Sequence, residues 1–142
     1  MVNGSELWKN QISVELIEKR LSSGKVITTY PGLPENLYEA VAKHAEMTPD
    51  KLAVEDSFGH RFTYGELKRT VDRFASALKY RYGVRKGDHA ALMMYSSAEF
   101  SVAFLALVKL GAVAVMLPTK YRKKEICALV GKSDLRYVIC DT

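Results

Sequence analysis

The sequence predicts an α/β fold built on a parallel sheet. Three short runs, His89–Tyr95, Ala112–Leu117 and Leu135–Cys140, have the nearly continuous apolar character of strands that are covered on both faces. Segments of helical periodicity separate them, and strands that alternate with helices form right-handed βαβ units with a parallel sheet. Three pairs have the spacing of a helix-capping box: Asn36 with Glu39, Thr63 with Glu66, and Ser96 with Glu99.

The first 34 residues are expected to form a leader helix and a linker, separate from an α/β portion at 35–142. Apolar residues recur at helical spacing between residues 5 and 23, and Ser22-Ser23-Gly24 ends that segment. Thr28–Pro34 contains two prolines and is expected to be extended. A helix that binds a membrane surface or a partner is the alternative. The mixed charge of its polar face favours a helix that packs on the main body.

The segment from Asn36 to Thr63 is expected to contain a helix and a hairpin. The helix begins after Asn36 and ends near Met47. Leu52–Glu55 and His60–Thr63 follow as two strands joined by a turn at Asp56–Gly59. Further helices are expected from Thr63 to near Gly83, over Ser97–Leu110 and over Lys123–Val130.

Composition is typical of a soluble globular protein, with a mildly basic net charge of +5. Cys127 and Cys140 lie in apolar runs, so both are expected to be reduced and buried. The three histidines, His44, His60 and His89, are scattered, and no metal site is expected. The start lacks the pattern of a signal peptide, which together with the cysteine usage favours a cytoplasmic location.

One stretch is apolar enough to imitate a membrane span. Phe100–Pro118 contains 19 residues with a single charge, Lys109, close to the ~20 that a spanning helix needs. Gly111 is a good helix stop, however, and alternating β-branched residues follow it. A buried helix that continues into a buried strand explains the stretch better, and no membrane span is expected.

Three blocks of sequence carry a resemblance to a known family. They are Phe62–Leu67, Gly87-Asp88, and Leu107–Val113 with Leu117-Pro118. In this order and at these intervals the blocks resemble the opening of adenylate-forming (AMP-binding) enzymes, which include acyl-CoA synthetases, luciferases and the adenylation domains of peptide synthetases. The resemblance runs from about Leu37 to the last residue. Many family members have Asn at the position of Ser96 and Asn-Pro at Pro118-Thr119, so no subfamily is assigned.

The resemblance implies an acid–thiol ligase, of the acyl- or aryl-CoA ligase type, in fatty acid metabolism. A carboxylate would attack ATP to give an acyl-adenylate, and CoA would then displace AMP, with magnesium assisting the first step. The family's phosphate-binding loop would follow Thr142, so this chain is expected to hold no catalytic residue, to bind no cofactor by itself and to be inactive alone. The alternatives are an adenylation domain that loads a carrier protein and a standalone α/β binding domain without catalysis.

The basic run Lys120–Lys124 is the candidate binding site. It follows the predicted carboxyl end of a parallel strand, where open α/β sheets place their ligand crevices. In some CoA ligases that the chain resembles, a basic residue at the position of Lys120 contacts the nucleotide phosphate of CoA, and Arg122 is a second candidate. A solvated helix start is the alternative interpretation. Tyr121 is the one aromatic residue in the run, so no nucleic-acid partner is expected.

Self-association is the last expectation. If the strands are central in a longer enzyme, they become edges in this chain, and unpaired edges favour pairing between copies. Dimers or larger species are therefore expected.

Overall fold

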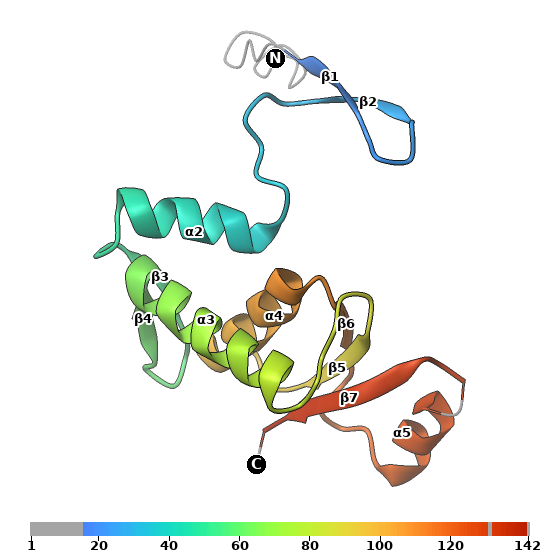
Figure 1. Ribbon diagram of the computed structural model, residues 1–142. Helices are drawn as coiled ribbons and strands as arrows, with labels where there is room; N and C mark the ends of the chain where they lie inside the picture. Colours follow the sequence, from blue (N-terminus) through green and yellow to red (C-terminus); the bar gives the residue numbers. More distant parts are fainter. Residues whose placement is uncertain (1–15, 131, 142) are drawn as a thin grey trace, which may run out of the picture. The chain divides into compact units, whose positions relative to one another are not determined.

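The computed structural model describes residues 16–130 and 132–141 (Figure 1). The contacts divide the chain into two units, Met1–Pro34 and Glu35–Thr142, which are described separately.

The first unit contains a two-stranded antiparallel hairpin of β1 (Ile17–Arg20) and β2 (Val26–Thr29). Gly24 has φ of 83°, and the amide of Leu21 donates to the carbonyl of Lys25 at 2.8 Å, which closes the turn. The leader helix expected over residues 5–23 is therefore wrong for Ile17–Arg20, and residues 5–15 lie outside the described part. Gly24 supplies a left-handed turn residue, and the β-branched run after it favours a strand, so the glycine joins two strands and does not end a helix.

The second unit begins with a helix, a hairpin and a second helix, as predicted. These are α2 (Leu37–Met47), β3 (Leu52–Glu55), β4 (Arg61–Thr63) and α3 (Tyr64–Tyr80). The two strands pair antiparallel, with a bulge between Leu52 and Val54. Strand β4 runs directly into α3, so the hairpin fixes where that helix starts.

The remaining elements form the predicted parallel sheet. They are β5 (His89–Met93), α4 (Ala98–Leu110), β6 (Val113–Met116), α5 (Lys123–Val130) and β7 (Leu135–Cys140). The strand order is β6-β5-β7, and β5 pairs parallel with both neighbours (Figure 1). The α/β class with a parallel sheet is confirmed.

The three predicted helix caps have different outcomes. Thr63 and Glu66 form the complete capping box, with N–O distances of 3.3 and 2.9 Å. Asn36 accepts from the amide of Glu39, but the Glu39 carboxylate reaches Glu35 and not Asn36. The Ser96 box is wrong. Ser97 is the cap of α4 and accepts from Phe100, which leaves the Glu99 side chain available to His60.

The hydrophobic core lies between α3, α4 and β5. Helix α3 contributes the stripe Leu67, Val71, Ala75 and Leu78, each at most 5% exposed. Helix α4 is apolar on most of its surface and buries residues that face both α3 and the sheet: Ala98, Val102, Ala103, Leu105, Ala106 and Leu107. Fully burying a leucine such as Leu107 stabilises a fold by about 1.5–3 kcal/mol.

Strands β6 and β7 are less buried than predicted. Along β7, half-buried residues alternate with exposed ones, and Val138 is 43% exposed. Both cysteines, expected to be buried, are exposed: Cys140 belongs to the outer face of β7, and Cys127 to the solvent side of α5. Only β5 has neighbours on both sides among the described strands, so an apolar run alone overestimates the burial of the outer strands. Self-association through these edges stays a prediction.

The stretch that imitates a membrane span is split in two. Gly111, with φ of 68°, ends α4 in the left-handed conformation, and β6 begins two residues later. In the described ranges no helix is long and apolar enough to cross a membrane.

A polar cluster joins the three helices α2, α3 and α4. The Asp72 carboxylate accepts from Tyr38 at 2.5 Å, from Lys68 at 2.9 Å and from Lys109 at 2.6 Å. The Lys109 ammonium also lies 4.6 Å from the centre of the Tyr38 ring. Partial burial alone would raise the pKa of Asp72, but the bonds from Lys109, Tyr38 and Lys68 lower it to about 2. The single charge of α4's apolar stretch is thereby neutralised.

We predict that Asp72→Asn lowers the free energy of unfolding by about 1–2 kcal/mol, because partly exposed charge-assisted bonds contribute modestly. Urea unfolding of the 142-residue chain measures it, with the exposed Asp50→Asn as control.

The depressed pKa of Asp72 also fixes a pH dependence. The contribution of Asp72 to the free energy of unfolding is complete above about pH 4 and is lost as the pH falls toward about 2. The difference in stability between wild type and Asp72→Asn should shrink over that interval, and a constant difference would contradict the assignment.

Candidate functional site

The carboxyl ends of the three parallel strands define one edge of the sheet. Strands β5, β6 and β7 end at Met93, Met116 and Cys140, and parallel strands bring these ends to the same side. The amide of Tyr95, after β5, donates to the carboxylate of Asp141, after β7, at 2.7 Å. The segments that follow the strands are thus joined at this edge.

Lys120 lies at this carboxyl edge, in the turn that follows β6. The amide of Leu117 donates to the carbonyl of Leu92 at 2.9 Å, which continues the pairing of β6 with β5 past Met116. The chain then turns, with Tyr121 donating to the carbonyl of Pro118 at 3.0 Å, and Lys120 is exposed within that turn. The position predicted for this residue, after a parallel strand's carboxyl end, is therefore observed.

Arg122 is exposed and precedes the first residue of α5. Its backbone amide donates to Oε2 of Glu125 at 2.9 Å, so a carboxylate already occupies the amino end of the helix. An anion that approaches Arg122 therefore meets the negative charge of Glu125. Among the described residues, no contact between Glu125 and Lys120 is seen. The structure brings both predicted basic residues to the same edge of the sheet, and a carboxylate lies beside Arg122.

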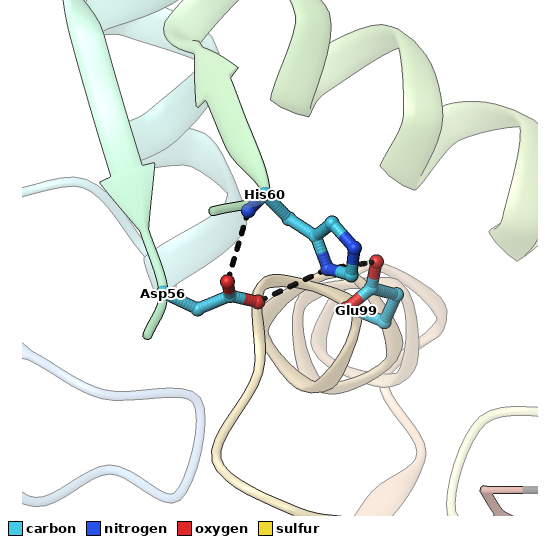
Figure 2. A group of neighbouring side chains, drawn as sticks. All are labelled: Asp56, His60 and Glu99. Carbon is cyan, nitrogen blue, oxygen red and sulfur yellow. Dashed lines mark hydrogen bonds and ion pairs between the residues drawn. The ribbon is translucent and has the colours of Figure 1, made fainter. Parts of the chain in front are cut away.

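A second grouping lies at the amino end of α4 and was missed from sequence. Asp56, His60 and Glu99 come from the hairpin turn, the residue before β4 and the first turn of α4, and Figure 2 shows their side chains pointing toward one another. Nδ1 of His60 lies 3.2 Å from Oδ2 of Asp56 and 3.1 Å from Oε1 of Glu99. From sequence, Asp56 is expected in a turn, Glu99 in a helix cap and His60 at the start of a strand.

Asp56 is the centre of this grouping. One carboxylate oxygen accepts from the amides of Phe58 and His60, and the other accepts from the amide of Ala98 at 3.0 Å. The Ala98 bond is the main reason that the pKa of Asp56 is lowered; burial opposes it, and the bonds from His60 and Phe58 assist it. A side chain of the hairpin turn thereby caps α4, which ties the hairpin to the helix.

Ligand atoms of the three residues lie within 4.8 Å of one another, a spacing that a metal ion could bridge. The contacts have an explanation without an ion, because both carboxylates face the same imidazole nitrogen and Asp56 is engaged by backbone amides. We assign the group a structural role. The sequence signal for the role of Asp56 is the Asp-x-x-Gly pattern of the turn. An aspartate side chain at this position accepts hydrogen bonds from the backbone amides that follow it.

Two of the three motif blocks are in contact with each other. The amide of Gly87 donates to the carbonyl of Gly111 at 2.9 Å, and the amide of Val113 donates to the carbonyl of Asp88 at 2.8 Å. The stem of Lys86 crosses Gly111, where an added Cβ would lie 3.0 Å from Cγ of the lysine. The spacing between the blocks therefore reflects one junction, where α4 ends and β5 and β6 begin.

Comparison with known proteins identifies the class. The model of the AMP-binding enzyme family matches residues 41–142. The chain is 36% identical over 99 residues to 2-succinylbenzoate–CoA ligase of Oceanobacillus iheyensis, covering 70% of this chain and 20% of that protein. It is 32% identical over 98 residues to the medium-chain fatty-acid–CoA ligase of Escherichia coli, covering 69% of this chain and 17% of that protein.

A solved structure supports the same class. The inhibitor-bound N-terminal domain of FACL13 from Mycobacterium tuberculosis superposes with a TM-score of 0.68 at 33% identity, covering 75% of this chain and 27% of that one. The chain belongs to the AMP-binding enzyme family. It spans about a fifth or less of the length of the curated relatives described above.

We predict that Asp56→Ala lowers the melting temperature of the 142-residue chain more than His60→Ala or Glu99→Gln does. Three backbone amides lose their acceptor in the first variant, whereas the other two remove contacts of half-exposed side chains. Thermal unfolding followed by circular dichroism makes the comparison. Equal melting temperatures for Asp56→Ala and wild type would contradict the role of Asp56 as a cap.

Proposed function

We propose that the chain is the front portion of an ATP-dependent acid–thiol ligase that joins a small carboxylic acid to CoA. The similarity to 2-succinylbenzoate–CoA ligase and to the medium-chain fatty-acid–CoA ligase supports this proposal, as does the fold of the matched region. The latter relative favours a place in fatty acid metabolism. The exposed free thiols of Cys127 and Cys140 are compatible with a reducing cytoplasm.

The proposed reaction has two steps. A carboxylate oxygen attacks the α-phosphorus of ATP and pyrophosphate leaves, which gives an acyl-adenylate. The sulfur of CoA then attacks the acyl carbon, the thiol proton is released, and AMP leaves. Mg²⁺ would offset the phosphate charge in the first step. The described residues contribute the scaffold and one side of the CoA site.

The single observation that carries the CoA assignment is the place of Lys120. It is an exposed cation in the turn after a parallel strand, at the edge where open α/β sheets bind their ligands. Its ammonium is a compact point charge, suited to a phosphate group. Because Glu125 occupies the amino end of α5 beside Arg122, we give Lys120 the main contact with the nucleotide phosphate and Arg122 a weaker one.

The energy of such a contact sets the expected effect. A charge-assisted hydrogen bond to phosphate contributes roughly 1.5–3 kcal/mol at best. Each ~1.4 kcal/mol is a factor of ten in affinity. A contact of this size affects the binding of CoA without being essential for the chemistry.

In the complete protein, we predict that Lys120→Ala raises the KM for CoA about tenfold to a hundredfold. It should leave the adenylation half-reaction unchanged, since CoA enters after that step. The effect should shrink with dephospho-CoA, which lacks the 3′-phosphate. Steady-state kinetics with CoA and with dephospho-CoA measure the two KM effects. ATP–pyrophosphate exchange measures the adenylation half-reaction.

The neighbouring exposed Lys123→Ala is the matched control, because it removes one charge from the same basic run. It should change the KM for CoA by less than Lys120→Ala. Equal slowing of adenylation and thioester formation by Lys120→Ala would mean that Lys120 is structural.

The 142-residue chain alone should show no ATP–pyrophosphate exchange with any carboxylic acid. The resemblance places the family's phosphate-binding loop after Thr142, and the chain covers 20% or less of the ligases it matches. Exchange above the background of a mock-purified sample would contradict this prediction.

A further inference from the structure

A concentrated basic and aromatic segment lies at the opposite edge of the sheet from Lys120. Residues 79–86 read Lys-Tyr-Arg-Tyr-Gly-Val-Arg-Lys, with four cations, two tyrosines and no acid. The segment covers the end of α3 and the connection to β5, so it lies beside the amino end of that strand. Tyr80 and Tyr82 are 78% and 57% exposed, so both rings are accessible to a ligand.

Part of this segment lines a hollow of about 500 Å³, which we call the amino-edge pocket. Lys79, Tyr80 and Gly83–Lys86 form one side, and Lys109 and Leu110 at the end of α4 form the other. Pockets for small molecules are typically about 300–1,000 Å³. The amino-edge pocket is thus large enough for one nucleotide and too small for a long polymer segment.

The amino-edge pocket carries net positive charge. The ion pairs seen among the described residues include none with Lys79, Arg85 or Lys86, while Lys109 is paired with Asp72. Asp88 bonds the backbone amide of Arg85, and its charge is matched by Arg136. Helices α3 and α4 both end here, and each carboxyl end contributes about −0.5 charge. The total positive charge of Lys79, Arg85 and Lys86 exceeds the negative charge of the two helix ends by about two charges.

One cation of the amino-edge pocket is held in place before any ligand binds. The stem of Lys86 packs across Gly111, whose left-handed conformation and missing side chain leave room for it. The Tyr80 ring has the ammonium of Lys79 5.1 Å from its centre, and the ring is otherwise largely in solvent. Cations can hold a phosphate group, and an accessible aromatic face beside them can stack a base.

We propose that the amino-edge pocket binds a free nucleotide that carries two or more phosphates. Lys79, Arg85 and Lys86 would contact the phosphates, and Tyr80 would stack on the base. This site is separate from the CoA contact proposed at Lys120, because the two lie at opposite ends of the parallel strands. It does not depend on the ligase function, and it departs from the expectation from sequence that this chain binds no cofactor by itself.

Isothermal titration of the 142-residue chain with ADP and ATP tests the site. Saturable binding is expected, and the double variant Lys79→Gln/Lys86→Gln should weaken it about tenfold or more, since charge-assisted contacts are lost. Glutamine keeps the part of the Lys86 stem that covers Gly111. The matched control, Lys123→Gln/Lys124→Gln, removes the same charge from α5 and should leave the affinity within about twofold, since exposed charges farther away than about 10 Å are screened at 0.1 M salt.

A base-specific comparison separates the site from a general attraction of anions. Tyr80→Ser should weaken ADP binding but leave the binding of inorganic tripolyphosphate unchanged, because only the nucleotide has a base to stack. Circular dichroism confirms that each variant is folded. The proposal is overturned if both double variants weaken binding equally, if Tyr80→Ser affects the two ligands equally, or if a single-stranded oligonucleotide binds while ADP and ATP do not.

Discussion

The burial of helix α4 is the constraint on which the rest of the second unit depends. Its residues face α3 on one side and the sheet on the other, and Ala98, Ala106 and Leu107 are completely buried. Such a helix cannot exist with its surface in water, so α3, β5 and β6 must assemble around it. The small residues of the helix let those neighbours approach closely.

Three arrangements satisfy the start, the end and the one lysine of α4. Asp56 reaches from the hairpin to cap its start together with Ser97, Gly111 ends it in a left-handed turn, and Asp72 neutralises Lys109. Each joins α4 to a different part of the chain. Two of the three motif blocks meet at the second of these points, since the amide of Gly87 donates to the carbonyl of Gly111.

Sequence reasoning recovered the second unit well because its signals are local. Capping residues, turn glycines and apolar periodicity gave the order of helices and strands from Leu37 to Cys140, and the parallel sheet followed from their alternation. It failed where the answer depends on tertiary neighbours. The exposure of Cys127 and Cys140 and the meeting of His60 with Glu99 depend on other segments of the chain. The hairpin at Ile17–Thr29 was missed for a local reason, because Gly24 joins two strands and does not end a helix.

The candidate site could be predicted only in part from the sequence, for the same reason. The place of Lys120 after a strand could be predicted, since it needs only the order of elements. Arg122 was already the second candidate from sequence. The contact of the Glu125 carboxylate with the start of α5, which supplies a structural reason for that order, could not be predicted.

Hydrogen–deuterium exchange of the complete protein, with and without CoA, tests whether CoA contacts the turn that contains Lys120. We predict that the backbone amides of residues 119–122 exchange more slowly when CoA is bound, and that dephospho-CoA gives less protection there. Unchanged exchange over residues 119–122, with protection elsewhere in the protein, would show that CoA binds without the edge that Lys120 occupies.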